Sequence, residues 1–265
     1  MNYGLYISAS GASSSMALMD ARANNLANVN TAAFKPDVLM LRARDAVRVE
    51  DNLPFANSVK MLERLGAGVM PMPTAVDLSQ GPIQHTDNPL DIALEGKGFM
   101  LVRDPRVAPG PTDDGTRLTR DGRLAIRSDG VLVTAAGRFP ILGEGGTEIT
   151  LSSTEPFQVF PDGRVIQGDF VAGRIALTGI QDPSALRKTG DGLYTLTAES
   201  GGLAAQATDP EARIVQGAYE GSAVDPVRSI LAVTTASSAA QGNLRMISLF
   251  NDIMGQAVGT LGRIS

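Results

Sequence analysis

Apolar and small residues recur in alternating steps of four and three at both ends of the chain. Near the N-terminus these steps connect Leu5, Ala9, Ala12, Met16, Met19, Ala23 and Leu26. Near the C-terminus they connect Ile230, Val233, Ser237, Ala240, Leu244, Ile247, Asn251, Met254, Val258 and Leu261. This spacing places each set on one face of an α-helix, as in the seam of a coiled coil. We therefore expect a long helix at each end, and we expect the two helices to pair as a coiled-coil-like stalk.

The region between the two ends has strand periodicity and glycine-rich turns. The pairs Asp121-Gly122, Asp129-Gly130 and Asp162-Gly163 each precede a short apolar run, and Asp-Gly favours tight hairpin turns. The pattern predicts an α+β fold in which a mainly antiparallel β domain is inserted between the terminal helices. The expected parts are the N-terminal helix and its closing motif at 1–34, an extended arm at 35–76, the β domain at 77–216 and the C-terminal helix at 217–265.

Composition narrows the classes of function. The 265 residues carry a net charge of −5 and no cysteine, so the sequence offers no basic footprint for nucleic acid, no disulfide framework and no cysteine-ligated zinc. No apolar run reaches the roughly 18 residues of a spanning helix. Serines between residues 8 and 15 interrupt the apolar stretch that a secretory leader needs, and we expect export without a cleaved signal peptide.

The terminal segments are nearly free of charge. Residues 1–34 contain only Asp20 and Arg22 as charged side chains, whereas an exposed helix normally presents a charged outer face. Outer faces made of Ser, Ala, Thr, Asn, Gln and Gly suit burial between neighbouring subunits. The alternative is an ordinary intramolecular helical hairpin with a polar, uncharged outside.

Asparagines are concentrated where the first helix should end. Asn24, Asn25, Asn28 and Asn30 precede Pro36. Asn tolerates the left-handed conformation that closes a helix, and Pro prevents the helix from resuming. One asparagine would suffice as a cap, so we expect the others to bond to backbone groups of adjacent subunits.

The segment from Asn24 to Lys35 resembles the N-terminal signature of the bacterial flagellar rod and hook proteins, the axial proteins of the basal body. That signature reads Asn-Asn-Leu-Ala-Asn-Val-Asn-Thr, a variable residue, then Gly-Phe-Lys. Ala33 stands where the family has Gly, which argues against a positive-φ turn there because Ala pays a steric cost in that conformation. Further blocks at 80–99, 119–137 and 220–227 resemble the family's central β domain and the lead into its last helix. In the last block Asp225 and Pro226 predict a helix start independently of the family.

The length and several local segments favour one member type of that family. The hook protein has a longer middle region, so 265 residues point to the rod. The opening Met1 to Tyr6 and the segments 142–146 and 191–194 look more like the proximal rod protein than the distal one. A distal rod or hook-type axial protein stays as the alternative.

The resemblance implies a structural axial component of the basal-body rod that polymerises helically through its terminal helices and transmits torque to the hook. Its partners would be other rod proteins, copies of itself, or both, in the periplasmic part of the basal body. We expect no cofactor and no metal. We also expect no small-molecule substrate, no nucleic acid partner and no membrane span. The residues expected at the assembly interface are Leu5, Met16, Met19, Asn24, Asn25, Leu26, Asn28, Asn30, Phe34, Ile230, Val233, Leu244, Ile247, Met254, Val258 and Leu261.

An enzyme and a binding module are the competing classes. His85 is the sole histidine of the chain, so a Ser-His-Asp triad would need it as its base, and we expect it to be a solvated surface residue. Asp87 and Asp91 follow turn and strand signals, as structural aspartates do. A peptidoglycan-associated enzyme therefore lacks a supporting carboxylate pair. A β-domain module that binds carbohydrate would lack its stacking surface, because aromatic residues make up 5% of the chain and Trp is absent.

Overall fold

The structure is a computed structural model that describes residues 3–45, 66, 68–108, 114–152, 155–197 and 206–261. Its residues form two compact units. The helical unit consists of 1–27, 37–75 and 225–265, and the β-rich unit consists of 28–36 and 76–224. Much of the predicted arm, residues 46–65, lies outside the described residues, and the predicted domain boundaries stay predictions.

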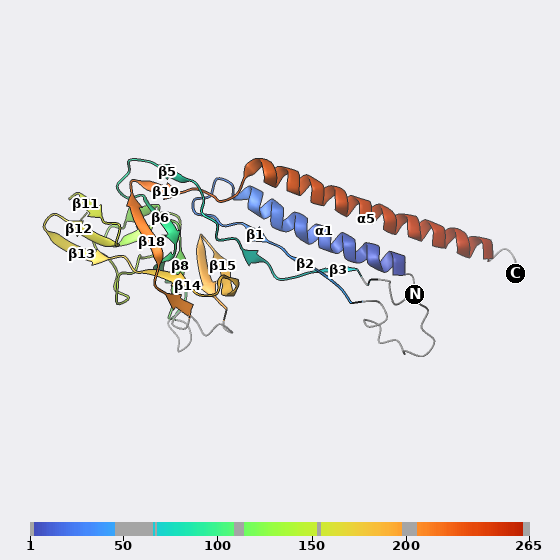
Figure 1. Ribbon diagram of the computed structural model, residues 1–265, viewed down its shortest axis with the longest axis horizontal. Coiled ribbons are helices and arrows are strands. Elements are labelled where there is room, and N and C mark those ends of the chain that lie inside the picture. The colour runs from blue at the N-terminus through green and yellow to red at the C-terminus, as the bar shows by residue number, and fades with distance from the viewer. Residues whose placement is uncertain are drawn as a thin grey trace. The chain divides into compact units, whose positions relative to one another are not determined.

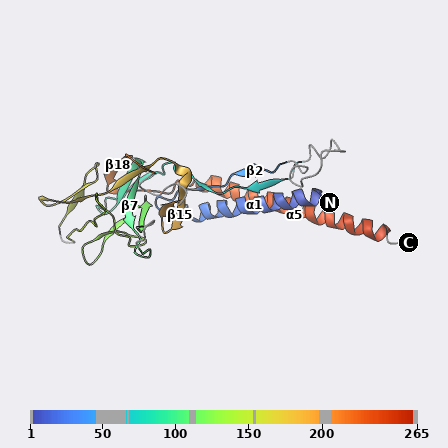
Figure 2. The ribbon, with the colours of Figure 1, turned by 90° about the horizontal axis from the view of Figure 1, so that it is seen from below.

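The helical unit contains two long helices, α1 (Tyr3–Ala27) and α5 (Pro226–Leu261). They lie side by side, and α5 extends beyond the N-terminal end of α1 (Figure 1). The same arrangement is visible from below (Figure 2). Strand β2 (Leu41–Ala43) pairs antiparallel with β3 (Val69–Pro71), and β3 packs along α1. The short strands β1 (Asp37–Val38) and β4 (Ala75–Val76) pair with each other.

The ends of both helices follow from local sequence. Helix α1 ends at Ala27, just before the predicted stop. Helix α5 begins at Pro226, and Oδ1 of Asp225 accepts a hydrogen bond from the backbone N–H of Arg228 at 3.1 Å. An aspartate cap followed by proline at the first helical position satisfies one of the free N–H groups of the first turn. The helix start predicted at Asp225-Pro226 is therefore confirmed.

The predicted coiled-coil-like stalk is wrong. A coiled coil needs large apolar side chains from both helices along one seam, whereas Ala12, Ala236 and Ala240 are the buried apolar residues of this helix pair. Two of the contacts between the helices instead pair a glycine of α1 with a side chain of α5, Gly4 with Phe250 and Gly11 with Asn243. The larger seam residues Ile230 and Leu244 are instead exposed, at 51% and 48%. The described residues form two long helices and a large, mainly antiparallel β region.

The β-rich unit is built from short strands. Its largest sheet has six strands in the order β15-β16-β8-β7-β14-β17, and a second sheet has the order β11-β12-β13. Smaller pairs are β18-β6, β19-β5 and β10-β9, and the pairs between these strands are antiparallel. The elements are β5 (Ile83–His85), β6 (Ile92–Lys97), β7 (Phe99–Arg103), β8 (Thr116–Thr119), β9 (Leu124–Ile126), β10 (Leu132–Thr134), β11 (Phe157–Val159), β12 (Arg164–Gln167), β13 (Phe170–Arg174), β14 (Leu177–Ile180), a 3-10 turn (Pro183–Ala185), β15 (Leu186–Gly190), β16 (Leu193–Leu196), β17 (Ala207–Thr208), β18 (Glu211–Gln216) and β19 (Ala218–Glu220).

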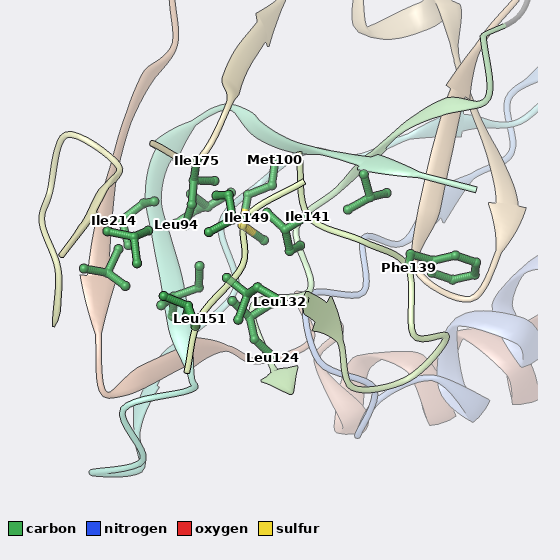
Figure 3. Packing of buried hydrophobic residues seen from close by; sticks show 14 of the residues in the cluster. Leu94, Met100, Leu124, Leu132, Phe139, Ile141, Ile149, Leu151, Ile175 and Ile214 are labelled. Carbon is green, nitrogen blue, oxygen red and sulfur yellow. The ribbon is translucent and has the colours of Figure 1, made fainter. Parts of the chain in front are cut away.

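One apolar core holds these strands together (Figure 3). Side chains from β6, β7, β10 and β18 meet in it, together with residues of the connecting segments. Leu132 and Ile141 are fully buried there. A smaller cluster packs Phe99 edge-on against Tyr194, with ring centroids 5.6 Å apart. Burial of this kind is the main stabilising contribution to a domain of this size.

The Asp-Gly pairs have two different structural roles. Gly130 and Gly163 have φ of 85° and 89° and sit in the turns between β9 and β10 and between β11 and β12, so the predicted hairpins are confirmed. Gly122 is not in a hairpin turn. A Cβ atom there would lie 1.6 Å from the carbonyl oxygen of Ile92, so this position needs glycine for close packing.

Candidate assembly site

The two long helices contact each other through glycine and small polar residues. A Cβ atom on Gly4 would lie 2.6 Å from Cζ of Phe250, and one on Gly11 would lie 3.1 Å from the side chain of Asn243. The guanidinium of Arg22 donates to the carbonyl oxygen of Ala232 at 2.8 Å. Residues early in α1 thus face residues late in α5, so the helices are antiparallel, and their close approach depends on the absence of side chains at the two glycines.

The predicted interface residues of the helical unit divide into two groups. Leu5, Met19, Leu26, Val233 and Ile247 are partly buried in this chain. Met16, Ile230, Leu244, Met254 and Val258 are exposed, Val258 at 71%. The side chain of Leu261 lies outside the described residues. The structure therefore covers one part of the predicted seam within the chain and leaves the other part in solvent.

Exposure of large apolar residues continues along most of α5. This exposed apolar set comprises Val227, Ile230, Leu231, Leu244, Met246, Leu249, Ile253, Met254 and Val258. Single exposed apolar residues are ordinary, but nine on one helix, in groups at 227–231 and 244–258, indicate interaction surfaces. Between Arg228 and the end of the described helix, Arg245 and Asp252 are the charged residues, so little on α5 opposes burial against another protein.

The asparagines after α1 do not share one environment. Asn25 is 8% exposed. Its Nδ2 donates to the carbonyl oxygen of Asp37 and its Oδ1 accepts from the Asp37 N–H, both at 2.8 Å. Asn24 and Asn30 are exposed, while Oδ1 of Asn28 accepts from the Thr31 hydroxyl at 3.1 Å. The Asn25 side chain therefore binds the backbone of Asp37 in the same chain. Contacts of the other three asparagines with adjacent subunits stay a prediction.

Ala33 adopts the conformation that the sequence argued against. Its φ is 53°, and it is buried, with its N–H donating to the carbonyl oxygen of Glu220 at 2.8 Å. The steric cost of a left-handed alanine is about 1 to 2 kcal/mol, and the hydrogen bond and the burial of the methyl group offset it. The positive-φ turn thus forms with alanine at this position.

Three charged side chains meet inside the β-rich unit and form what we call the ion cluster. Lys35 and Glu220 have side chains at 0% exposure, and that of Arg120 is at 2%. Glu220 Oε1 accepts from Lys35 Nζ at 2.6 Å, and Oε2 accepts from Arg120 Nε at 2.9 Å. The N–H of Gly81 also donates to Oε1, at 2.8 Å. The two cations thus share a single anion, and all three side chains are shielded from bulk solvent.

Burial in this cluster lowers the pKa of Lys35 below its ordinary value, and the positive charge of Arg120 lowers that pKa further, while the hydrogen bond and charge of Glu220 act in the opposite direction. Desolvation disfavours the charged form of a lysine, so an opposite charge must compensate. Glu220 provides most of this compensation, and the charge of Asp77 adds a smaller part by also raising the pKa of Lys35.

Phe34 lies beside the cluster residue Lys35 in sequence but has a different neighbour. Nζ of Lys188 is 4.0 Å from the centroid of the Phe34 ring, a cation–π geometry. Phe34 is partly buried. Its place in an assembly interface stays a prediction.

Reasoning from the sequence missed Arg120 and Glu220. Both residues belong to segments that carry the family resemblance, as does Lys35, yet 185 positions separate Lys35 from Glu220. The available signal was that each of three separate segments with family resemblance contains one of these charged residues: a lysine, an arginine or a glutamate. Only the fold brings them together.

The described residues offer no sign of catalytic chemistry. Among them, no three His, Asp or Glu side chains gather closely enough to hold a metal ion. His85 is exposed on β5, as predicted, and Asp91 accepts a hydrogen bond from the Thr86 hydroxyl at 2.7 Å in a structural turn. Within the described part of the chain, neither helix has the length and hydropathy to cross a bilayer. Long helices with exposed apolar residues indicate instead a structural subunit that joins other subunits.

Comparison with known proteins places this subunit in a family. The flagellar basal-body rod protein FlgF of Caulobacter vibrioides is 34% identical over 266 residues, which cover 100% of both chains. FlgG of the same organism is 30% identical and covers 94% of this chain and 96% of its own. FlgF of Salmonella typhimurium is 27% identical over 97% of each chain. No protein-family model matches the sequence.

This chain belongs to the family of flagellar basal-body rod proteins and is a structural component of the rod. The relative named FlgF has both the higher identity and the full coverage, which supports the proximal rod type that the sequence favoured over the distal type. Assembly with other rod components follows from this membership.

Proposed function

We propose that this protein polymerises helically with other rod subunits through its terminal helices and transmits torque toward the hook. The observation that carries the proposal is the exposed apolar set of α5. Contacts that join different faces of successive subunits and do not close into a ring produce a filament. A filament held by many such helices resists twisting because each subunit is fixed to several neighbours.

Two further features support this proposal over a catalytic one. The exposed set is accompanied by little charge, so its burial between subunits carries a small desolvation penalty. The relatives are named rod proteins, a structural role without a reaction. We therefore propose a non-enzymatic subunit whose partners are other rod proteins or copies of itself, located in the periplasmic part of the basal body. Export without a cleaved leader stays a prediction.

Replacing Leu244 by aspartate tests the proposal. Leu244 is 48% exposed on α5, so Leu244→Asp is compatible with the folded monomer but places a charge on a surface that would be buried in the rod. We expect the variant to be absent from purified basal bodies and its cells not to swim in soft agar, in a strain that lacks the native copy.

Gln158→Asp is the matched control, because it adds the same charge at an exposed position of the β-rich unit. It should leave incorporation and swimming intact. Circular dichroism of both purified variants should match the wild type. Normal incorporation of Leu244→Asp would refute assembly through this surface.

A further inference from the structure

Two segments that are distant in sequence are held together in the β-rich unit. Residues 28–36, which we call the signature segment, follow α1 in the chain, and residues 218–224 lead into α5. The N–H of Ala33 donates to the carbonyl oxygen of Glu220 at 2.8 Å, and the N–H of Ala223 donates to the carbonyl oxygen of Phe34 at 3.0 Å. Each segment thus supplies the other with backbone partners, and the ion cluster lies at this contact.

Arg120 has partners in the β core that do not depend on Glu220. Its guanidinium donates to the carbonyl oxygens of Gly98 at 2.9 Å and Gly96 at 3.0 Å. These residues belong to the region of β6 and β7, whose position is set by the apolar core. Arg120 is therefore held as a fixed buried cation by the core itself.

Lys35 has much less support without Glu220. Besides the Glu220 carboxylate, Nζ donates to the carbonyl oxygen of Ser79 at 2.7 Å. Without the Glu220 carboxylate, the buried ammonium would face the guanidinium of Arg120 with no hydrogen-bonded counterion, and the opposite charge left to act on it would be Asp77, whose influence on Lys35 is weaker than that of Glu220. Removing one member of a buried ion pair is strongly destabilising because the remaining charge is uncompensated. Lys35 can therefore enter its site only when Glu220 already occupies the space between the two cations.

We infer that Glu220 is a positioning residue that makes the structure of the signature segment conditional on the C-terminal strand β19. Arg120 recruits Glu220 when β19 pairs with β5, and the carboxylate then accepts Lys35, which draws residues 28–36 into place. The signature segment therefore adopts its final conformation only in a chain whose C-terminal part is folded. Its effect on rod assembly rests on the function proposed above.

Hydrogen exchange of the full-length chain tests this dependence of the signature segment on Glu220. Protected amides of the signature segment include those of Thr31, Ala33 and Phe34, each of which donates a backbone hydrogen bond. In Glu220→Gln we expect peptides covering 28–36 to exchange at least about tenfold faster, because local opening becomes easier when the buried ammonium loses its counterion. Peptides covering β6 and β10 should remain protected.

A second variant separates this mechanism from general loss of stability. Lys35→Met combined with Glu220→Gln removes the ammonium that needed the counterion, so protection of 28–36 should return toward the wild-type level even if Glu220→Gln alone exchanges throughout. Glu95→Gln is the control, since it breaks an exposed pair with Arg213, and it should leave exchange of 28–36 unchanged.

Two results would overturn the inference. One is wild-type protection of 28–36 in Glu220→Gln, and the other is a double variant that exchanges as fast as Glu220→Gln. Swimming of cells that carry each variant is a separate readout. Suppose that hydrogen exchange changes as expected but cells with Glu220→Gln swim normally. The positioning role of Glu220 is then supported, and the claim that rod assembly depends on it is refuted.

Discussion

The β-rich unit and the helical unit treat their apolar residues in opposite ways. In the β-rich unit, Leu132 and Ile141 are at 0% exposure, and the buried charges of the ion cluster are paired with one another. In the helical unit, Leu244 and Val258 are 48% and 71% exposed. The β-rich unit buries a continuous apolar core and leaves Phe170 and Val171 of β13 exposed, whereas the helical unit leaves large apolar residues exposed at both ends of α5. This difference is what the assembly proposed above requires, because a packed core stabilises the β-rich unit while apolar area on α5 stays accessible.

The largest expected effect is in the β core. Leu132→Ala should lower the free energy of unfolding of the β-rich unit by about 2 to 5 kcal/mol, through lost burial and the cavity that remains. Leu244→Ala is the matched change on α5 and should cost less than about 1 kcal/mol in the monomer, since half of the side chain is already in solvent. Urea denaturation followed by circular dichroism measures both. Similar losses would contradict the comparison.

The next effect concerns a polar contact inside the helical unit. Asn25→Ala leaves the N–H and carbonyl of Asp37 without their side-chain partners, and alanine regains some helix propensity. The net loss should be about 1 to 2 kcal/mol, measured as faster hydrogen exchange of the Asp37 amide. Asn30→Ala, at an exposed position, is the control and should leave that amide unchanged.

Ala33 tests how the signature turn tolerates a missing glycine. In Ala33→Gly, relief of the left-handed conformation gains about 1 to 2 kcal/mol. Loss of a buried methyl group costs about 0.8 kcal/mol, and the greater freedom of the unfolded chain costs about 0.4 to 1 kcal/mol. Stability should therefore change by less than about 1 kcal/mol, as measured by thermal denaturation. A larger gain in stability would mean that the turn at Ala33 is strained by more than the ordinary cost of a left-handed alanine.

The smallest effect is a pH dependence at the surface of the β-rich unit. The side-chain hydrogen bond from Arg127 lowers the pKa of Asp129 from 3.8 to about 2. A lowered carboxyl pKa adds stability above pH 3.8 that is lost as the pH falls toward 2. Asp129→Asn should be slightly less stable than the wild type at pH 6, and the difference should vanish near pH 2 in unfolding curves. A difference that persists at low pH would exclude this ion pair as its cause.

Local chemistry made part of the fold predictable. The cap at Asp225, the proline at Pro226 and the turns at Gly130 and Gly163 depend on residues within a few positions of each other. The face that α5 turns toward α1 was not predictable from the apolar spacing alone. Gly4 and Gly11 decide that face by allowing close approach, and a pattern of large apolar residues does not contain that information.

The ion cluster could not be predicted from the sequence for a different reason. Lys35, Arg120 and Glu220 lie in separate blocks, and nothing in the local sequence of any one of them requires a charged partner. Burial makes the pairing obligatory, and burial is a property of the completed fold. Ala33 illustrates the same limit, since its positive φ is maintained by a hydrogen bond to Glu220.

The antiparallel helix pair repeats itself along its length. Gly4 and Gly11 are one heptad apart, as are their partners Phe250 and Asn243. A slip of one heptad, about 10.5 Å along the axis at 1.5 Å per residue, would bring Gly11 opposite Ala236, a residue small enough to fit. Because glycine and alanine alone would distinguish these two pairings poorly, polar bonds such as that from Arg22 to the Ala232 carbonyl are what make the observed register specific.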